Sequence, residues 1–442
     1  MRPEYDAIRA SDVTIARLRA LHPSLIDLST GRVERLLEAL GRPQDRLPPV
    51  IHVAGTNGKG STCAYLRAIA EAAGLKVHAI ISPHLVRFAE RIRIAGQLIS
   101  EEELALRIDE VEAANAGQPI SFFEITTALA LHAFAQTPAD LTVVEVGLGG
   151  RFDASNVFAA PAVSVITPVD YDHLEMLGPE LSKIAWEKAG IIKKRRPVVV
   201  ARQMEEALQV IESEAQTLFA PMTLMGRDID AYEQNGRLIV QLEDGLLDLP
   251  PPSLFGQHQF DNAGLAVAAI KTWGHPAIDD AAIARGVAQT VWPGRFQQIT
   301  KGPLAELARP SGADLWLDGA HNPHAGRALA DAVARLAARD GRPVVMIVGM
   351  LGRKDNRGFF EAFRGAAHKV FTTSFESPSA TPPEDLAASA TEVGLDAEVA
   401  NGVEDALVRA LARPGLPPHV LICGSLHFVG DVLSLSPETW PT

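Results

Sequence analysis

The stretch that decides the fold is Gly55-Thr56-Asn57-Gly58-Lys59-Gly60-Ser61-Thr62. An apolar run at residues 50–54, typical of a buried β-strand, precedes it, and a helical pattern follows from about Ser61 to Ala73. Glycines let the backbone wrap closely around an anion, and the helix N-terminus adds positive potential. Lys59 is then placed to neutralise the β- and γ-phosphates of a nucleotide while a hydroxyl holds Mg²⁺. We therefore predict a phosphate-binding loop centred on Lys59.

The spacing within this loop differs from the standard pattern G-x-x-x-x-G-K-[ST]. Gly55 lies three residues before Gly58, not five, and Gly60 separates Lys59 from Ser61. An ordinary Gly-rich turn between a strand and a helix is the alternative interpretation. The preceding strand, the lysine and the paired hydroxyls together favour phosphate binding.

Outward from the loop, short apolar runs alternate with helical patterns. We expect strands at residues 77–81, 141–146, 162–167 and 197–201, and Gly74 stands where the end of a helix favours positive φ. β-branched runs separated by helices predict a buried parallel sheet. Residues 237–249 predict instead an antiparallel hairpin that turns near Asp244 and Gly245.

The alternation restarts beyond Trp292-Pro293-Gly294-Arg295, which has the composition of a hinge. We expect strands at 315–317, 344–348, 370–373 and 420–422, and a loop at 377–383. Because 442 residues are too many for one hydrophobic core, an α/β protein of two domains is predicted. Residues 1–298 would form a P-loop-type parallel-sheet ATP-binding domain, and residues 299–442 a smaller Rossmann-like α/β C-terminal domain.

The composition excludes several other classes of protein. Hydrophobic residues make up 47% of the chain and charged residues 21%, as in soluble globular proteins. A net charge of -13, with no Lys/Arg run that stands out, argues against a general nucleic-acid or membrane-surface binder, although a few cations suffice for a small anionic ligand. Cys63 and Cys423 make neither a disulfide framework nor a zinc ribbon. No apolar signal core or membrane-spanning stretch is evident, so we expect a cytoplasmic protein.

Three further side chains have alternative interpretations. Glu145 ends an apolar strand before the Gly-rich residues 147–153, so it is placed to hold a cation beside phosphates or, alternatively, to cap a helix or form a salt bridge. A lone histidine such as His173 is more often structural than a metal ligand. Lys188 lies on an Ala-rich helix, where a lysine ordinarily extends to solvent.

Two residues further along the chain are candidates for nucleotide contacts. Asn262 is placed to recognise an adenine edge or, like Asp261, to cap a helix at its N-terminus. Arg295, at the expected hinge, is placed to reach phosphates when domains close, and an exposed surface arginine is the alternative.

Residues 55–62, with Ile51-His52-Val53-Ala54 before them, resemble the folylpolyglutamate synthase/dihydrofolate synthase branch of the Mur ligase superfamily. The peptidoglycan Mur ligases are similar, but they usually carry Thr or Ser directly after the lysine. Gly followed by Ser is typical of the folate branch, of which the bifunctional bacterial type is the expectation. The resemblance runs from about Leu36 to Val432. Phe152 departs from it, since the family usually has Leu there.

The resemblance implies the following roles. Two Mg²⁺ ions would be held by Ser61, Glu145 and His173, although imidazole is an unusual ligand for Mg²⁺. Lys59, His321 and Lys188 would be catalytic, with Lys188 carbamylated by CO₂ and thus an anion near Mg²⁺. The active site would lie in the cleft between the two domains. ATP would be bound by Thr56, Asn57, Gly58, Lys59, Gly60, Ser61, Thr62, Asn262, Arg295 and Asp318.

For the folate, the resemblance points to Ser82, His84 and Arg91, with Arg91 pairing a substrate carboxylate. Phe123 would stack on a flat pterin, and plain core packing is an equal alternative. Ser425 would lie near the glutamate site.

These roles imply a ligase that joins L-glutamate to dihydropteroate or to folate polyglutamates, or to both. ATP would convert the carboxylate into an acyl phosphate, which the glutamate amine attacks. A peptidoglycan Mur-type ligase and a nucleotide switch that does no ligation are the competing hypotheses. The expected partners are ATP, L-glutamate and dihydropteroate or folate, with no nucleic acid and no membrane. A monomer is expected, and the chain length of the polyglutamate stays open.

Overall fold

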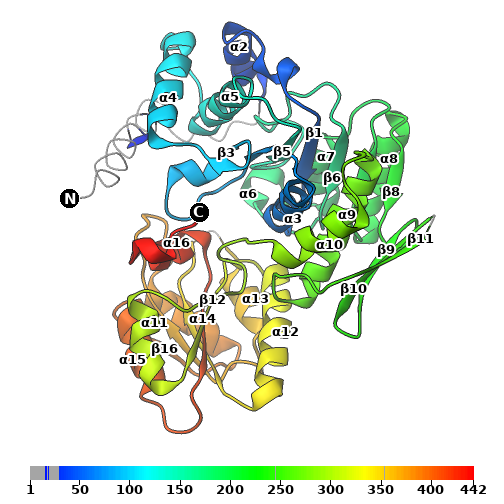
Figure 1. The fold of residues 1–442 in the computed structure, drawn as a ribbon. Helices are drawn as coiled ribbons and strands as arrows, with labels where there is room; N and C mark the ends of the chain where they lie inside the picture. The colour runs from blue at the N-terminus through cyan, green and yellow to red at the C-terminus, as the bar shows by residue number, and fades with distance from the viewer. Residues whose placement is uncertain (1–14, 17, 19–28, 244, 353) are drawn as a thin grey trace. The chain divides into compact units, whose positions relative to one another are not determined.

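The structure is a computed structural model that describes residues 15, 16, 18, 29–243, 245–352 and 354–442 (Figure 1). The chain divides into two compact units. Unit 1 comprises residues 1–253 and 260–290, and unit 2 comprises residues 254–259 and 291–442. The sequence predicts a boundary after residue 298, whereas the boundary between the units lies at 290/291. The strand at 297–299 therefore belongs to unit 2.

An eight-stranded sheet forms the centre of unit 1, and it is parallel except at one edge. The strands of the predicted parallel sheet are all present. The short strands β3, β4 and β8 were not predicted. The order is β4 (Gln97–Leu98), β3 (Ile92–Ile94), β2 (Val77–Ile80), β5 (Leu141–Glu145), β1 (Val50–Ala54), β6 (Val163–Ile166), β7 (Val198–Val200) and β8 (Met222–Leu224).

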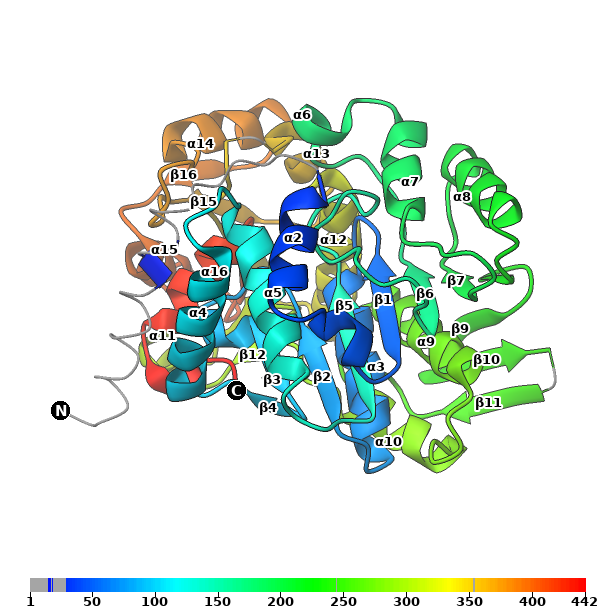
Figure 2. The same ribbon diagram turned by 90° about the horizontal axis from the view of Figure 1, so that it is seen from above.

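Helices cover this sheet because their apolar faces need burial. In Figures 1 and 2, α2, α4 and α5 lie grouped together, and their buried residues share one hydrophobic cluster with strands β2, β3 and β5. α7 and α8 pack on each other beside β6 and β7. The helices of unit 1 are α2 (Gly31–Ala39), α3 (Lys59–Ala72), α4 (Glu101–Asn115), α5 (Phe122–Phe134), α6 (Leu174–Leu177), α7 (Leu181–Ala189), α8 (Glu205–Thr217) and α10 (Asp280–Gln289), with 3₁₀ turns η1 (Pro43–Arg46) and η2 (Phe88–Arg91). Helix α9 (Gln257–Trp273) belongs to unit 1 from Phe260 onward.

The predicted hairpin is part of a three-stranded antiparallel sheet. β10 (Arg237–Leu242) pairs with β11 (Gly245–Leu249) and with β9 (Asp230–Gln234). Asp244, half of the predicted turn, lies outside the described residues. β9 has the polar sequence DAYEQ, which gave no strand signal.

Unit 2 is a six-stranded sheet with helices, and only its first strand is antiparallel. The four expected strands are present, and the edge strands β12 and β16 were not predicted. The order is β12 (Gln297–Ile299), β13 (Asp314–Leu317), β17 (His419–Cys423), β14 (Val344–Val348), β15 (Lys369–Thr372) and β16 (Ala397–Val399). The helices are α11 (Pro303–Ala308), α12 (Pro323–Asp340), α13 (Asn356–Glu361), α14 (Pro383–Glu392), α15 (Val403–Leu411) and α16 (Leu426–Ser434), with 3₁₀ turns η3 (Arg309–Ser311) and η4 (Pro437–Thr439).

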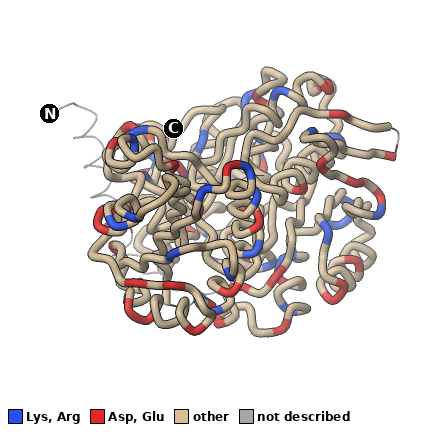
Figure 3. Tube along the Cα trace, turned by 90° about the horizontal axis from the view of Figure 1, so that it is seen from below, with Lys and Arg blue, Asp and Glu red and all other residues tan. Residues whose placement is uncertain are grey.

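Charges of both signs are interspersed along the described chain (Figure 3). The basic stretch Lys193-Lys194-Arg195-Arg196 is an exception in the sequence. Part of it is engaged in local structure, since Arg196 Nε donates to the carbonyl oxygen of Pro161 at 2.7 Å. Among the described residues, no helix is long and apolar enough to cross a membrane.

Candidate active site

The predicted phosphate loop connects β1 to α3, as the sequence indicated. The helix begins at Lys59, slightly before the expected Ser61. Gly58 precedes it with φ 87°, a left-handed conformation that favours glycine. A Cβ on Gly58 would also lie 2.4 Å from Oδ1 of Asn262, so glycine is required there for two reasons.

Asn262 therefore packs against the phosphate loop. It is buried at 6% exposure in the second turn of α9, which begins at Gln257. The alternative in which Asn262 or Asp261 caps the helix is wrong, because the helix starts several residues earlier. Asp261 instead pairs with Arg202, whose Nη1 donates to Oδ1 at 2.8 Å.

Thr56 and Lys59 fix the loop from within. The Thr56 hydroxyl donates to the carbonyl oxygen of Asp170 at 2.9 Å and accepts from its N–H at 3.0 Å. Lys59 Nζ donates to the carbonyl oxygens of Gly55 at 3.1 Å and Thr56 at 3.2 Å. The lysine is thus held over the loop that would receive the phosphates.

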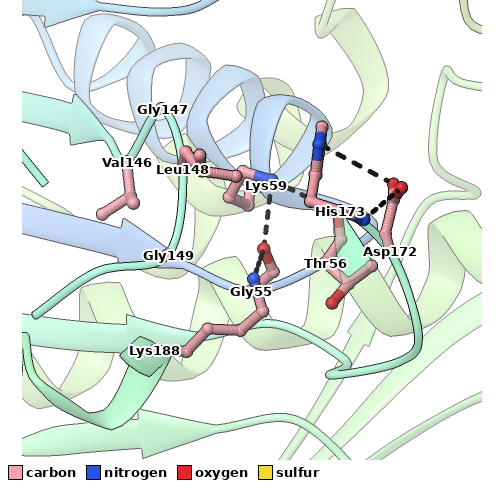
Figure 4. Close-up of a pocket in the computed structure, with 10 residues that line it drawn as sticks. All are labelled: Gly55, Thr56, Lys59, Val146, Gly147, Leu148, Gly149, Asp172, His173 and Lys188. Atoms are coloured by element: carbon pink, nitrogen blue, oxygen red, sulfur yellow. Dashed lines mark hydrogen bonds and ion pairs between the residues drawn. The ribbon is translucent and has the colours of Figure 1, made fainter. Parts of the chain in front are cut away.

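A pocket of about 300 Å³, part of it open to solvent, lies at this loop (Figure 4). It brings together four of the predicted site residues, Thr56, Lys59, His173 and Lys188, from three separate stretches of sequence. The other lining residues are Gly55, Val146, Gly147, Leu148, Gly149 and Asp172.

Lys188 is buried, which rules out the alternative of a solvated surface lysine. Its exposure is 5%, and its Nζ donates to the carbonyl oxygen of Gly55 at 2.8 Å. Burial and, to a smaller extent, the positive charge of Lys59 lower the pKa of Lys188 to about 7, although Asp172 opposes both. An amine with such a pKa is substantially unprotonated near neutral pH and can act as a nucleophile.

The Gly-rich residues 147–153 pack against α7, which carries Lys188. A Cβ on Gly150 would lie 2.7 Å from the carbonyl oxygen of Glu187, and Arg151 N–H donates to that oxygen at 2.6 Å. This close approach of two backbones explains the glycine run and places Lys188 at the pocket.

Asp153 is a structural anchor that the sequence interpretation did not assign. Its carboxylate, 3% exposed, accepts hydrogen bonds from Leu148 N–H at 2.9 Å, Ser155 N–H at 2.9 Å and the Ser155 hydroxyl at 2.5 Å. Burial raises the pKa of Asp153 above its usual value, and these hydrogen bonds offset only part of that rise. The signal was available, since a lone acid lies three residues after the last glycine, Gly150.

The network continues to the strand before the phosphate loop. Since the Ser155 hydroxyl donates to Asp153, it accepts from Nε2 of His52 on β1 at 3.0 Å. His52 is fully buried, and burial lowers its pKa to about 3, so it stays neutral. β1 and the Gly-rich loop are therefore tied together beneath the pocket.

Glu145 and Ser61 supply oxygen donors of the kind that Mg²⁺ prefers. Glu145 is buried at the carboxyl end of β5, and its Oε2 accepts from Ser82 N–H at 3.1 Å. The pKa of the Cys63 thiol is raised mainly by burial and next by the negative charge of Glu145, whereas Lys59 lowers it. The Glu145 carboxylate therefore lies within electrostatic range of the first turns of α3. Glu145 is not a helix cap.

The donor set fits Mg²⁺ in the manner of phosphate-loop sites. In the described part of the chain, no group of three or more His, Cys, Asp or Glu side chains is arranged to hold a metal ion. Mg²⁺ commonly takes one or two protein oxygens and completes its shell with phosphates and water, so a site of this kind needs few protein ligands.

His173 lies at the pocket in a left-handed conformation, with φ 54°. Its N–H donates to Oδ1 of Asp172 at 2.8 Å, and its Nε2 is 3.9 Å from Oδ2 of the same residue (Figure 4). The structure places this histidine beside Lys59 and Lys188 in the pocket lining, and does not bring it into a carboxylate cluster.

Of the expected folate residues, Ser82, His84 and Arg91 lie on the segment between β2 and β3, and Phe123 lies on α5. Arg91 Nε donates to Nδ1 of His84 at 2.7 Å, and the Arg91 guanidinium carbon is 5.7 Å from the Phe88 ring centroid. Ser82 is joined to Glu145 as described above. Phe123 is partly buried against the cluster of α2, α4 and α5, and its ring approaches Gly147 of the pocket.

In unit 2, three predicted residues lie close together at the end of β13: Arg295, Asp318 and His321. Asp318 is buried and accepts from Phe296 N–H at 2.8 Å and Ala320 N–H at 2.7 Å. Burial raises the pKa of Asp318, and the charge of Arg295 opposes this. His321 Nδ1–H donates to the carbonyl oxygen of Gly319 at 2.9 Å.

Ser425 has a clear structural role. Its buried hydroxyl caps α16 by accepting from His427 N–H at 3.1 Å. The following residue, Leu426, packs on Gly319, where a Cβ would meet its Cδ2 at 2.2 Å. Ser425 is therefore close in the fold to the Asp318 turn.

Comparison with known proteins agrees with these two units. Residues 53–270 match the Mur ligase middle domain, and residues 294–426 match the Mur ligase glutamate ligase domain. The chain is 34% identical over 419 residues to the Bacillus subtilis dihydrofolate synthase/folylpolyglutamate synthase, covering 91% of this chain and 93% of that protein.

Solved structures give the same result. The Escherichia coli FolC structure in complex with DHPP and ADP is 33% identical, with a TM-score of 0.86 over 96% of this chain and 97% of that one. A Yersinia pestis folylpolyglutamate synthase/dihydrofolate synthase complexed with AMPPNP and Mn ion is 34% identical, with a TM-score of 0.84 over 96% and 97%. These relatives favour the folate branch over the peptidoglycan ligases and over a nucleotide switch. The chain therefore belongs to the dihydrofolate synthase/folylpolyglutamate synthase family of Mur ligases, the ATP-dependent acid–amino-acid ligases that its phosphate loop first indicated.

Proposed function

We propose that this chain is bifunctional: it joins L-glutamate to dihydropteroate and also extends folate polyglutamates. The observation that most supports the ligation itself is the pocket in which Lys59, His173 and Lys188 meet the phosphate loop. The relatives whose names include both activities add to it.

The residues of this chain divide the work as follows. The phosphate loop and Lys59 bind and neutralise the ATP phosphates, so that the γ-phosphate can pass to the substrate carboxylate and make it a good electrophile. Mg²⁺, held by Ser61, Glu145 and His173, supplies further charge neutralisation when bound. Arg91 and His84 hold the folate carboxylate end, and Phe123 offers a flat apolar face.

Residues 299–442 would supply the glutamate-binding domain, as residues 1–298 would supply ATP and folate binding. Within unit 2, we assign Asp318 to the nucleotide ribose and Arg295 to its phosphates. His321 is assigned to the phosphate and the incoming amino acid, and Ser425 to the glutamate site. The supporting observation is that Arg295, Asp318 and the Gly319–Leu426 contact gather at the carboxyl end of β13, where ligand sites of α/β sheets form.

We further propose that Lys188 reacts with CO₂ to form a carbamate. The amine nitrogen forms a bond to carbon, one C=O π bond opens, and a proton is released. The burial of Lys188 and its pKa of about 7 support this, because only the unprotonated amine is nucleophilic.

The test is mass analysis of the products formed from dihydropteroate and, separately, from tetrahydrofolate, each with ATP and L-glutamate. We expect one added glutamate on dihydropteroate and a ladder of glutamates on tetrahydrofolate. Reactions without ATP are the control. A product from only one of the two substrates would contradict bifunctionality.

A further inference from the structure

The backbone of the segment 82–91 is held together by one acidic residue, Glu90. Glu90 lies in η2 and is only 7% exposed. Its Oε2 accepts from Leu85 N–H at 2.8 Å, and its Oε1 accepts from Val86 N–H at 2.9 Å and Arg87 N–H at 2.6 Å. Three consecutive backbone amides thus converge on one carboxylate, in the manner of an anion nest.

These bonds close a loop whose two ends carry the candidate substrate residues. His84 directly precedes the amides that Glu90 binds, and Arg91 directly follows Glu90. Arg91 and His84 meet across the closed loop, because Arg91 Nε donates to His84 Nδ1 at 2.7 Å. The start of the segment is fixed separately, by the hydrogen bond from Ser82 to Glu145.

Only a carboxylate can make this set of bonds from position 90. An ionised acid accepts through both oxygens, whereas an amide of the same size presents one acceptor oxygen and one NH₂ donor. A glutamine would therefore direct a donor at backbone N–H groups and leave at least one of them without its acceptor.

We propose that Glu90 is a positioning residue for the substrate: it shapes the loop 84–91 so that Arg91 and His84 lie ready for the carboxylate end of a pteroate or folate. This inference rests on the proposed function, in which Arg91 and His84 hold that carboxylate. Glu90 itself is turned toward the backbone and does not touch the substrate.

The experiment compares steady-state kinetics of the parent, Glu90→Gln and Glu102→Gln, with dihydropteroate and ATP varied in turn. Glu102 is an exposed acid on α4 and is the matched control. For Glu90→Gln we expect the KM for dihydropteroate to rise about tenfold, the size expected for losing a charge-assisted hydrogen bond. The KM for ATP and kcat should stay within about twofold, because the phosphate loop keeps its own contacts.

A second comparison separates positioning from general loosening of the fold. Because Glu90 acts through Arg91, Glu90→Gln should add less than about twofold to the dihydropteroate KM when Arg91→Ala is already present. A KM for dihydropteroate that is unchanged, a parallel rise in both KM values, or a full effect in the Arg91→Ala background would each overturn the inference.

If Glu90→Gln does not fold, Glu90→Asp replaces it. The shorter carboxylate keeps its charge but reaches fewer amides, so a smaller rise confined to dihydropteroate is expected, and an unchanged KM or a rise in both would overturn the inference. A parent that formed no glutamylated product would overturn the proposed function together with this inference, whereas an active parent isolates the role of Glu90.

Discussion

Lys188 Nζ and the Gly55 carbonyl oxygen are joined by a hydrogen bond of 2.8 Å, which ties helix α7 to the first residue of the phosphate loop. Lys59 Nζ donates to the same oxygen at 3.1 Å. Two cationic side chains therefore meet at one carbonyl group. Burial is the main cause of the lowered pKa of Lys188, and this second cation adds to it.

Lys188→Ala should be nearly inactive, because the proposed carbamate anion beside Mg²⁺ would be lost. Small carboxylates such as acetate should restore part of the activity by occupying the same space. Lys183→Ala is the control, since Lys183 lies on the same helix but is exposed and pairs with Glu180 at 3.0 Å. That control should change stability by no more than about 0.5 kcal/mol. Normal turnover by a folded Lys188→Ala protein would exclude any catalytic role.

Carbamate formation at Lys188 should increase as the pH rises through about 7. Below that pH the amine is protonated and cannot attack CO₂, and above it the neutral amine predominates. Carbon NMR with ¹³C-labelled bicarbonate and Mg²⁺-ATP should show a carbamate signal that grows with pH and is absent in Lys188→Met. A bare ammonium at Lys188 in a crystal grown under these conditions would be the opposite result.

Lys59→Ala should lower turnover by at least about 100-fold, the size expected for removing one preorganised donor from a transition state. The fold should persist, because the hydrogen bonds of Lys59 Nζ to the described residues go to the loop carbonyls of Gly55 and Thr56. Product formation and melting temperature should be measured together, with exposed Lys194→Ala as the control. Near-normal product formation would remove the phosphate-loop hypothesis.

Glu145→Gln should raise the Mg²⁺ concentration needed for half-maximal activity by about tenfold or more, as for other disturbed metal sites. The fold should be retained, since a glutamine oxygen can still accept from Ser82 N–H. Activity is titrated against Mg²⁺ in this variant, in the parent and in exposed Glu34→Gln. An unchanged titration would show that Glu145 is purely structural.

Gly147→Ala should destabilise the protein by about 1–3 kcal/mol, the usual range for overpacking. The new Cβ would lie 2.3 Å from Cζ of Phe123, so one of the two must move. Phe123→Ala should relieve the clash, and the double variant should regain part of the loss in urea unfolding. Gly31→Ala is the control, because no atom lies within 4 Å of its added Cβ. Equal stability of the Gly147→Ala and Gly31→Ala proteins would contradict the contact.

The sequence predicted the central parallel strands well, because they are short apolar runs, and several, such as β6 and β7, are rich in β-branched residues. Edge strands such as β12, with sequence QQI, and β9 were missed because half-exposed strands tolerate polar residues. Neither alternation nor an apolar run marks them.

The candidate site, too, could be predicted only in part from the sequence. The phosphate loop could be predicted because its backbone shape depends on neighbouring glycines. The burial of Lys188 could not, since the helix alone resembles any Ala-rich surface helix, and only packing on Gly150 turns the lysine inward. The capping alternative for Asn262 and Asp261 was wrong, because α9 already begins at Gln257.

The hydrogen bonds of Asp153 determine which substitutions the Gly-rich loop at residues 147–153 can accept. Besides the Ser155 hydroxyl, Asp153 binds the backbone N–H groups of Leu148 and Ser155, and every residue except proline possesses such a group. Substitutions at the positions between the glycines and Asp153 therefore leave these hydrogen bonds intact. Phe152, whose side chain is exposed, stands at such a position. The outward side chains of the loop can therefore differ without altering the backbone geometry that lines the pocket.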